Sequence, residues 1–149
     1  MSKKINSHLE DTIAKLMKEN LERKNEAKQS ELALDRKLDD IGADLIQIMD
    51  AFEKAEERIK DRGLDQEESS KKAIKQLLLA KRKTEAIFEK YRITKIEFPD
   101  GIANDNLCEV TGTVPDSSMA EGTIVSVGKT GYLRDGRLIR RAEVEIVKN

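Results

Sequence analysis

Residues 122–148 read GTIVSVGKTGYLRDGRLIRRAEVEIVK. The pair Asp135-Gly136 stands between Leu133-Arg134 and Arg137-Leu138, and an Asp-Gly pair in this setting is the strongest short-range signal for a β-hairpin. After the hairpin, apolar and acidic residues alternate in the order Ala142, Glu143, Val144, Glu145 and Ile146. This alternation predicts a strand with one buried and one wet face.

The triplet Gly128-Lys129-Thr130 has the residues that end a nucleotide-binding P-loop. A P-loop places four residues between its first glycine and the Gly-Lys pair, because a loop of that length cradles the phosphates. Here five residues separate Gly122 from Gly128, and β-branched residues predominate among them. Such residues favour an extended strand. The triplet therefore predicts a glycine-bounded turn between two strands, and a nucleotide site is not expected.

The remaining β structure is predicted from turn signals and short apolar runs. Clusters of Pro, Asp, Gly and Asn at 99–101 and 104–106 mark turns. The expected strands cover residues 107–114, 123–127, 131–134, 137–140 and 142–147. A β domain of about sixty residues with so few aromatic side chains has a small core.

The composition of the 149-residue chain limits any single core. Charged residues make up 38% and aromatic residues 3%, so something other than one thick core must organise the chain. The 28 basic and 29 acidic residues nearly cancel, which argues against a polycation that binds nucleic acid. The single cysteine, Cys108, fits a reducing compartment. No signal-peptide pattern or membrane-spanning apolar run is present, so the sequence predicts a soluble cytoplasmic protein.

A long helix is predicted from Ile5 to about Lys60, where the chain has no proline and one glycine, Gly42. Apolar residues recur there in alternating steps of four and three, as in a coiled coil or helical bundle. The stripe consists of Leu34, Leu38, Ile41, Leu45, Ile48, Phe52, Ala55 and Ile59. Between Asn20 and Glu31 the same register is almost entirely polar. Since a lone helix is marginally stable, the stripe predicts self-association.

A second helix is predicted after Asp61-Arg62-Gly63, where the glycine closes the first helix. Asp65 and Glu68 have the spacing of a capping box at its start. The buried face of this helix is expected to contain Ile74, Leu77, Leu78, Phe88 and Tyr91. Helices joined by a short turn are antiparallel neighbours, so two chains would form a four-helix bundle.

Few residues suggest a chemical reaction. His8 has no second histidine or cysteine near it and is expected to be solvated, and Cys108 is expected to be a small buried strand residue. The carboxylates are spread along the helices, where they are interpreted as solubilising and register-setting charges. The arginines form one local excess of charge, at 134, 137, 140 and 141. Arginine suits phosphates or the carboxylates of a protein partner, but few aromatic residues accompany these for base stacking.

Three motifs resemble those of the GrpE nucleotide-exchange factors. The run at 122–148 is similar to their C-terminal signature, in a pattern formed by Gly122, Gly131, Tyr132, Arg137, Leu138, Ile139, Arg140, Ala142, Val144 and Ile146. The segment LIQIMDAFEKA at 45–55 is similar to the family's leucine-rich motif in the first bundle helix. A weaker match is Asn106-Leu107-x-Glu109, which is similar to the family's Asn-Leu-His-Glu.

Four positions depart from the family pattern. Cys108 stands where histidine is common, Arg92 where the second bundle helix often ends in glycine, and Arg141 where proline or alanine is usual. Gln47 stands where many members have a helix-interrupting proline, so the first helix is expected to run unbroken. These departures indicate a divergent member of the family.

The resemblance implies an α+β fold in three parts. Residues 1–40 would form a dimerising, coiled-coil-like stalk helix, 41–92 a helical hairpin that makes a four-helix bundle in the dimer, and 93–149 a small all-β domain, the partner-binding wing. The dimer contacts are expected at Leu34, Leu38, Ile41, Leu45, Ile48, Phe52, Ile59, Ile74, Leu77 and Leu78.

The implied function is that of a non-enzymatic co-chaperone in protein folding and the stress response. A homodimer would bind the nucleotide-binding domain of a DnaK-type chaperone and promote ADP release, with no cofactor, metal or catalytic residue and no direct contact with nucleotide, nucleic acid or membrane. The partner contacts are expected at Lys129, Asp135, Arg137, Leu138 and Arg140.

Two of these arginines are expected to have different roles. Arg137 and Arg140 lie three apart, which in a regular strand places them on opposite sides. Arg137 directly follows the turn, so the partner contact is assigned to it and a structural role to Arg140.

Two alternatives of other classes remain open. One is a coiled-coil scaffold protein with a GrpE-like fold that has lost chaperone binding. The other is a nucleic-acid-binding β module on a dimerising stalk. Acceleration of ADP release from a DnaK-type chaperone separates both from an exchange factor.

Overall fold

The computed structural model describes residues 2–149, with side chains from Ser7 onward. The residues up to Leu38 and the residues Asp39–Asn149 form separate compact units. The first unit is helical and belongs to helix α1 (Ser2–Asp61). Its large apolar side chains, including Leu9, Ile13, Leu16, Met17 and Leu21, are exposed in the single chain. His8 is exposed as well, as the sequence predicts.

The second unit begins with the last turns of α1, which is helical through Gln47 as expected from the missing proline. The helix ends at Asp61, and Gly63 takes the left-handed conformation with φ 63° that closes a helix end, which confirms the predicted boundary. A 3₁₀ turn, η1 (Leu64–Gln66), connects to helix α2 (Glu68–Lys90). Helix α2 returns to α1, and the Lys81 ammonium pairs with the Glu56 carboxylate between the two helices.

The predicted capping box at the start of α2 is wrong. Asp65 lies within η1, so the residue that precedes the first turn of α2 is Glu67. Among the described residues no side chain caps the backbone there. The short 3₁₀ turn uses the residues that the pattern assigned to the helix start, and the helix therefore begins later than the box requires.

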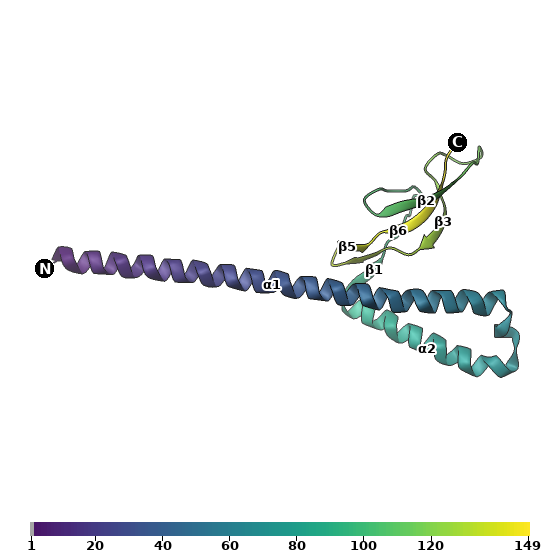
Figure 1. The fold of residues 1–149 in the computed structure, drawn as a ribbon, viewed down its shortest axis with the longest axis horizontal. Coiled ribbons are helices and arrows are strands. Elements are labelled where there is room, and N and C mark those ends of the chain that lie inside the picture. Colours follow the sequence, from purple (N-terminus) through teal and green to yellow (C-terminus); the bar gives the residue numbers. More distant parts are fainter. Residues whose placement is uncertain (1) are drawn as a thin grey trace. The chain divides into compact units, whose positions relative to one another are not determined.

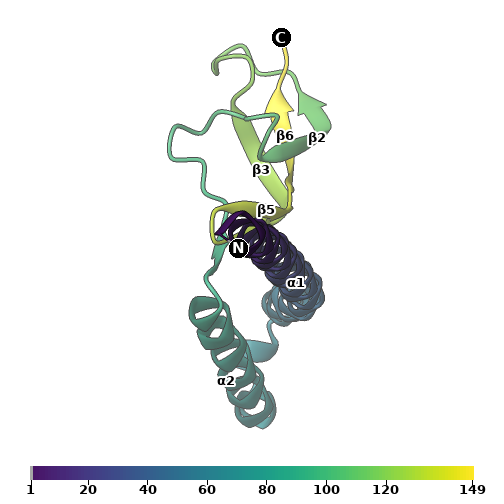
Figure 2. The same cartoon turned by 90° about the vertical axis from the view of Figure 1, so that its left-hand side faces the viewer.

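The β domain follows α2 directly (Figure 1). Its strands are β1 (Ile93–Lys95), β2 (Cys108–Val114), β3 (Ile124–Lys129), β4 (Tyr132–Arg134), β5 (Arg137–Arg140) and β6 (Ala142–Val147). Within residues 2–149 they form two three-stranded sheets, ordered β1-β4-β5 and β2-β6-β3. Strand β6 lies between β3 and β2 (Figure 2), antiparallel to β3 and parallel to β2. The α+β class is confirmed, and β1 is a strand that the sequence analysis did not define.

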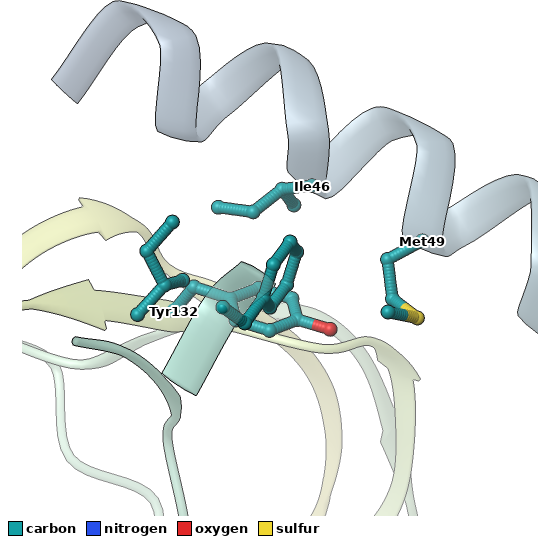
Figure 3. Packing of buried hydrophobic residues seen from close by; sticks show 5 residues of the cluster. Ile46, Met49 and Tyr132 are labelled. Carbon is teal, nitrogen blue, oxygen red and sulfur yellow. The ribbon is translucent and has the colours of Figure 1, made fainter. Parts of the chain in front are cut away.

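Two buried clusters hold this unit together. The first joins the helices to the β1-β4-β5 sheet: Ile46 and Met49 of α1 project toward Tyr132, and Phe88 and Ile93 complete the cluster (Figure 3). The Phe88 and Tyr132 rings meet edge to face with centroids 5.5 Å apart. The second cluster lies in the β2-β6-β3 sheet around Cys108, Ala142 and Val144. Cys108 is buried, as predicted, and its thiol donates a hydrogen bond to the Asn104 carbonyl.

Tyr91 does not belong to the buried face of α2 that was predicted for it. Its side chain is exposed, because α2 ends at Lys90 and the chain turns at Tyr91 and Arg92 toward β1. Phe88 is buried as expected, and Ile74, Leu77 and Leu78 are half-buried. The helical period therefore fails only where the helix itself has already ended.

Candidate partner-binding hairpin

The hairpin predicted at Asp135-Gly136 is present. Strands β4 and β5 pair antiparallel, with Arg134 opposite Arg137 and Leu133 opposite Leu138. Both turn residues are left-handed, Asp135 at φ 49° and Gly136 at φ 78°. Two consecutive positive φ angles are those of a type I′ turn, whose twist matches the flanking strands. Leu138, which is one of the expected partner contacts, is 43% exposed.

A β-bulge in this hairpin corrects the expected orientation of its arginines. Leu138 pairs with Leu133 and Arg140 with Tyr132, so two steps along β5 match one step along β4. The extra residue shifts the alternation of side chains by one. Arg137 and Arg140 therefore both reach carboxylates of α1, and the prediction that they lie on opposite sides is wrong.

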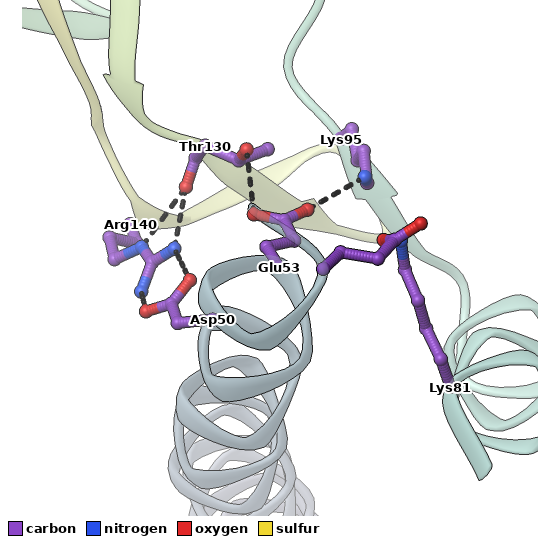
Figure 4. Close-up of polar contacts among 7 residues, drawn as sticks. Asp50, Glu53, Lys81, Lys95, Thr130 and Arg140 are labelled. Carbon is purple, nitrogen blue, oxygen red and sulfur yellow. Dashed lines mark hydrogen bonds and ion pairs between the residues drawn. The ribbon is translucent and has the colours of Figure 1, made fainter. Parts of the chain in front are cut away.

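The Arg140 guanidinium is anchored by hydrogen bonds to Asp50 of α1 and to Thr130. Its Nη1 and Nη2 donate to Asp50 Oδ2 and Oδ1 at 2.5 and 2.7 Å, and its Nε and Nη2 donate to the Thr130 carbonyl at 3.1 and 2.7 Å (Figure 4). Its guanidinium carbon also lies 5.5 Å from the centre of the Tyr132 ring. Such a bidentate pair is strong and geometrically specific, so Arg140 fixes β5 on α1.

Arg137 and Arg134 meet at one carboxylate, that of Asp39. Arg134 is buried and its Nε donates to Asp39 Oδ1 at 2.5 Å, whereas Arg137 is 47% exposed and its Nη2 lies 3.1 Å from Asp39 Oδ2. Arg137 thus combines an internal ion pair with a solvent-accessible position. The role of Arg134 was not predicted, because its sequence position next to the turn suggests exposure and its burial depends on α1.

The acidic residues of α1 are the part of this arrangement that the sequence interpretation missed. Glu53 accepts hydrogen bonds from Lys95 at 3.0 Å and from the Thr130 hydroxyl at 3.5 Å (Figure 4). Together with Asp39 and Asp50, it gives α1 a set of carboxylates directed at β1, β5 and the β3–β4 connection. The sequence pattern predicts solubilising charges at these three positions, but the carboxylates bind the β domain to the helix instead.

Lys129 and Asp135, the other expected partner contacts, lie in different places. Lys129 ends β3 and its ammonium is 3.6 Å from the Glu143 carboxylate, in the other sheet. Asp135 lies at the hairpin tip and pairs with Arg92 at 3.1 Å and Arg134 at 3.3 Å. The structure therefore groups Asp135, Arg137 and Leu138 at the hairpin and leaves Lys129 outside it.

The Gly-Lys-Thr triplet does not have P-loop geometry. Gly128 and Lys129 belong to β3, and only Thr130 and Gly131 connect that strand to β4. Because a strand follows where a P-loop requires a helix N-terminus, the triplet cannot cradle a phosphate in the expected way. The prediction that a break between two strands lies here is confirmed at Thr130 and is wrong at Gly128 and Lys129, and Gly131, which was predicted in a strand, lies in the connection.

Tyr132 lies beneath the hairpin with its ring fully buried. Its hydroxyl has no hydrogen-bond partner among the described residues. Burial, reinforced by the Glu53 carboxylate, raises the pKa of this phenol well above its ordinary value, so it stays protonated. Tyr132 therefore serves as a packing residue that supports Arg140.

The described part of the chain carries neither a metal-binding cluster nor a membrane-spanning helix. No group of three or more His, Cys, Asp or Glu side chains between residues 2 and 149 is arranged to hold a metal ion. No helix in the same range is both long and apolar enough to cross a membrane. What the hairpin does present is an exposed leucine beside a half-exposed arginine, a combination that suits a protein partner with an acidic surface.

Comparison with known proteins identifies the family. The sequence matches the GrpE family over residues 1–148. It is 27% identical over 148 residues to Protein GrpE of Paramagnetospirillum magneticum, covering 94% of this chain and 73% of the relative. It is 32% identical over 107 residues to Protein GrpE of Parvibaculum lavamentivorans, covering 70% and 50%. It is also 30% identical over 109 residues to the human GrpE protein homolog 2, mitochondrial, covering 69% and 47%. The chain therefore belongs to the GrpE family of nucleotide-exchange co-chaperones.

Proposed function

We propose that this protein binds the nucleotide-binding domain of a DnaK-type chaperone and promotes release of ADP. The observation that carries the proposal is the match to the GrpE family over residues 1–148, which includes both the helical part and the hairpin. The arrangement at the hairpin supports it, because exposed Leu138 and Arg137 are held by a firmly anchored sheet. In this proposal the protein acts without a catalytic group. We place it in the cytoplasm, because its one cysteine, Cys108, is free and buried, which fits a reducing compartment.

The mechanism we propose is a shift between chaperone conformations. The chaperone's nucleotide cleft opens and closes, and ADP is held by the closed state. A protein that binds the open state more tightly than the closed one increases the open population and so speeds ADP release. The β domain would act as the wedge. It is held to α1 by the hydrogen bonds of Arg140 with Asp50 and of Thr130, in the β3–β4 connection, with Glu53.

The proposed contact surface centres on Asp135, Arg137 and Leu138. Leu138 would enter an apolar depression of the partner, while Arg137 would reach a carboxylate at its rim. Arg140 and Lys129 contribute less directly, because Arg140 is engaged with Asp50 and Lys129 with Glu143. In this proposal Arg140 supports the position of Leu138.

We also propose that the active form is a homodimer. The exposed side chains of Leu34, Ile41 and Ile48 share the predicted stripe of α1, and in the single chain they face solvent. Leu38, Leu45, Phe52, Ile59, Ile74, Leu77 and Leu78 are half-buried and have apolar surface left to contribute. Burying these side chains between two chains would supply the hydrophobic contact that the individual helices lack.

The test is the release of a fluorescent ADP analogue from a purified DnaK-type chaperone, followed by stopped flow after addition of excess unlabelled ATP. We expect the rate to rise with the concentration of this protein and to saturate. Arg137→Ala should require a higher concentration for half-saturation. A release rate that stays at the value of the chaperone alone up to saturating concentrations would contradict the proposal. Nucleic-acid binding without any change in release would favour the alternative of a nucleic-acid-binding module.

A further inference from the structure

Arg92 has a backbone conformation that is unfavourable for arginine. It follows Tyr91 at the end of α2, and its φ is 55°, in the left-handed region. For a residue with a Cβ this region is strained by contact with the neighbouring carbonyl oxygen, whereas glycine adopts it freely. At this position the stability of the fold therefore favours glycine over arginine.

Among the described residues, the side chain of Arg92 makes one contact that could compensate for the strain. Its Nη1 lies 3.1 Å from Asp135 Oδ1, and within the described residues this is the one side-chain hydrogen bond of its guanidinium. The Arg92 side chain is 79% exposed, and an ion pair so accessible to water contributes little to stability. An arginine guanidinium has five N–H donors, so a side chain this exposed leaves donors accessible to a partner.

The backbone of Arg92 is hydrogen-bonded to the tip of the hairpin. The Asp135 amide donates a backbone hydrogen bond to the Arg92 carbonyl at 3.2 Å, so the end of α2 and the tip of the β4–β5 turn are joined by backbone as well as by side chains. Asp135 is also left-handed, at φ 49°. Two residues with Cβ atoms in this conformation, bound to each other, fix where the Arg92 side chain begins.

We propose that Arg92 is a specificity-determining contact residue, which presents its free guanidinium donors to a carboxylate of the chaperone. The inference rests on the proposed function and extends its contact surface from β5 across the turn to the end of α2. Arg92 and Arg137 would then contact acidic groups on either side of the turn, and a partner with an acidic surface would be selected over one without. The strained backbone is retained because glycine would lack the side chain.

The deciding experiment compares Arg92→Gly with Arg92→Ala in the full-length protein. Glycine removes both the side chain and the strain, whereas alanine removes the side chain and keeps the strain. We expect both variants to bind the chaperone 3- to 30-fold more weakly in a titration of the ADP-release rate, with the maximal rate unchanged. Their melting temperatures should differ: Arg92→Gly should equal or exceed the wild type, and Arg92→Ala should be lower than Arg92→Gly.

Controls separate this contact from general charge and from the proposed function itself. Arg62→Ala, which removes an exposed arginine beyond the end of α1, should bind like the wild type, and Arg92→Lys should recover part of the affinity. The affinity difference between wild type and Arg92→Gly should shrink as salt is raised.

If the wild type accelerates release and Arg92→Gly does so at the same half-saturating concentration, Arg92 is not a contact residue. Weaker binding together with a lower melting temperature of Arg92→Gly would also overturn the proposal, because it indicates a structural role. If the wild type itself does not accelerate release, the proposed function fails first.

Discussion

Helix α1 has two apolar faces between Asp39 and Asp61, and they have opposite environments. Ile46 and Met49 are 1% and 0% exposed, because they pack against Phe88, Ile93 and Tyr132. Ile41 and Ile48, which are equally apolar, are 55% and 48% exposed. The chain completes the first face by itself and leaves the second face open. One helix therefore carries a face that packs against its own β domain and a second face that, in the proposed dimer, would contact another chain.

The largest expected effects come from substituting one residue on each of the two faces. Ile46→Ala should lower the free energy of unfolding by about 2–5 kcal/mol, because it leaves a cavity beneath Tyr132. Ile48→Asp should instead give a folded monomer, because its charge would lie between the two chains of the proposed bundle. Denaturant titration and sedimentation measure the two effects. A dimeric Ile48→Asp variant with wild-type stability would show that the open face is not the dimer contact.

Leu45 is unsuitable for this comparison, although it belongs to the predicted stripe. Its side chain is half-buried and packs against the cluster around Ile46 and Tyr132. A charge at Leu45 would therefore disturb both faces at once. Ile48 separates the two contributions because it lies on the open face.

The next effect distinguishes the two arginines that tie β5 to the closed side of α1. Arg140→Ala leaves the partly buried Asp50 carboxylate without its bidentate partner and should cost about 1–3 kcal/mol of stability. Arg137→Ala should cost less than about 1 kcal/mol, because Asp39 keeps its contact with Arg134. Thermal unfolding of both variants, in parallel with the ADP-release titration, provides the measurement. We expect Arg137→Ala to weaken chaperone binding by about 1–3 kcal/mol. Equal melting temperatures for the two variants would contradict the assignment of Arg140 as the anchor.

A smaller effect, of about 1 kcal/mol, is expected from pH at the junction of α1 and α2. The hydrogen bond from Lys81 lowers the pKa of Glu56 below its ordinary 4.5, and the same bond raises the pKa of Lys81 above its ordinary 10.5. The pair therefore contributes fully between about pH 4.5 and 10.5. Its contribution is lost as the pH falls through the lowered pKa of Glu56 or rises through the raised pKa of Lys81.

Glu56→Gln measures this contribution directly. The melting temperature of the wild type should exceed that of Glu56→Gln near neutral pH, and the difference should shrink as the pH falls below 4.5 and through the lowered pKa of Glu56. A difference that is constant from pH 3 to pH 7 would mean that the ion pair is not the cause.

The sequence predicted those features that depend on neighbours along the chain. The Asp135-Gly136 hairpin, the end of α1 near Gly63 and the alternation in β6 are local patterns, and all three are present. The closed face of α1 was not predicted, although Ile46 and Met49 interrupt the stripe by being apolar outside its register. The periodic stripe accounts for one set of apolar residues. The second set, Ile46 and Met49, is explained only by the packing of the β domain against the helix.

The sequence predicted which arginines belong to the candidate site, but not which residues they contact or the side of the strand on which they lie. The arginines of the hairpin were identified, yet their partners Asp39 and Asp50 lie about ninety residues earlier in the chain, at separations of 98 and 90. The bulge at Leu138–Arg140 also reverses the side on which Arg140 is expected, and strand periodicity gives no sign of it. Long-range ion pairs and one-residue bulges are set by tertiary packing, which a local pattern does not contain.

Ile41→Ala is the most specific test of the open face, and its expected effect within a single chain is the smallest considered. Ile41 is more than half exposed in the single chain, so Ile41→Ala removes few contacts within it. In the monomeric Ile48→Asp background, the substitution should change the free energy of unfolding by less than about 0.5 kcal/mol, and the higher helix propensity of alanine should offset part of that. In the wild-type background, the same substitution should cost about 1–3 kcal/mol of dimer stability, because Ile41 would be buried between chains. Denaturant titrations over a range of protein concentrations measure both values. The two faces of α1 differ as described only if the effect of Ile41→Ala depends on the second chain, so equal values in both backgrounds would remove Ile41 from the dimer contact.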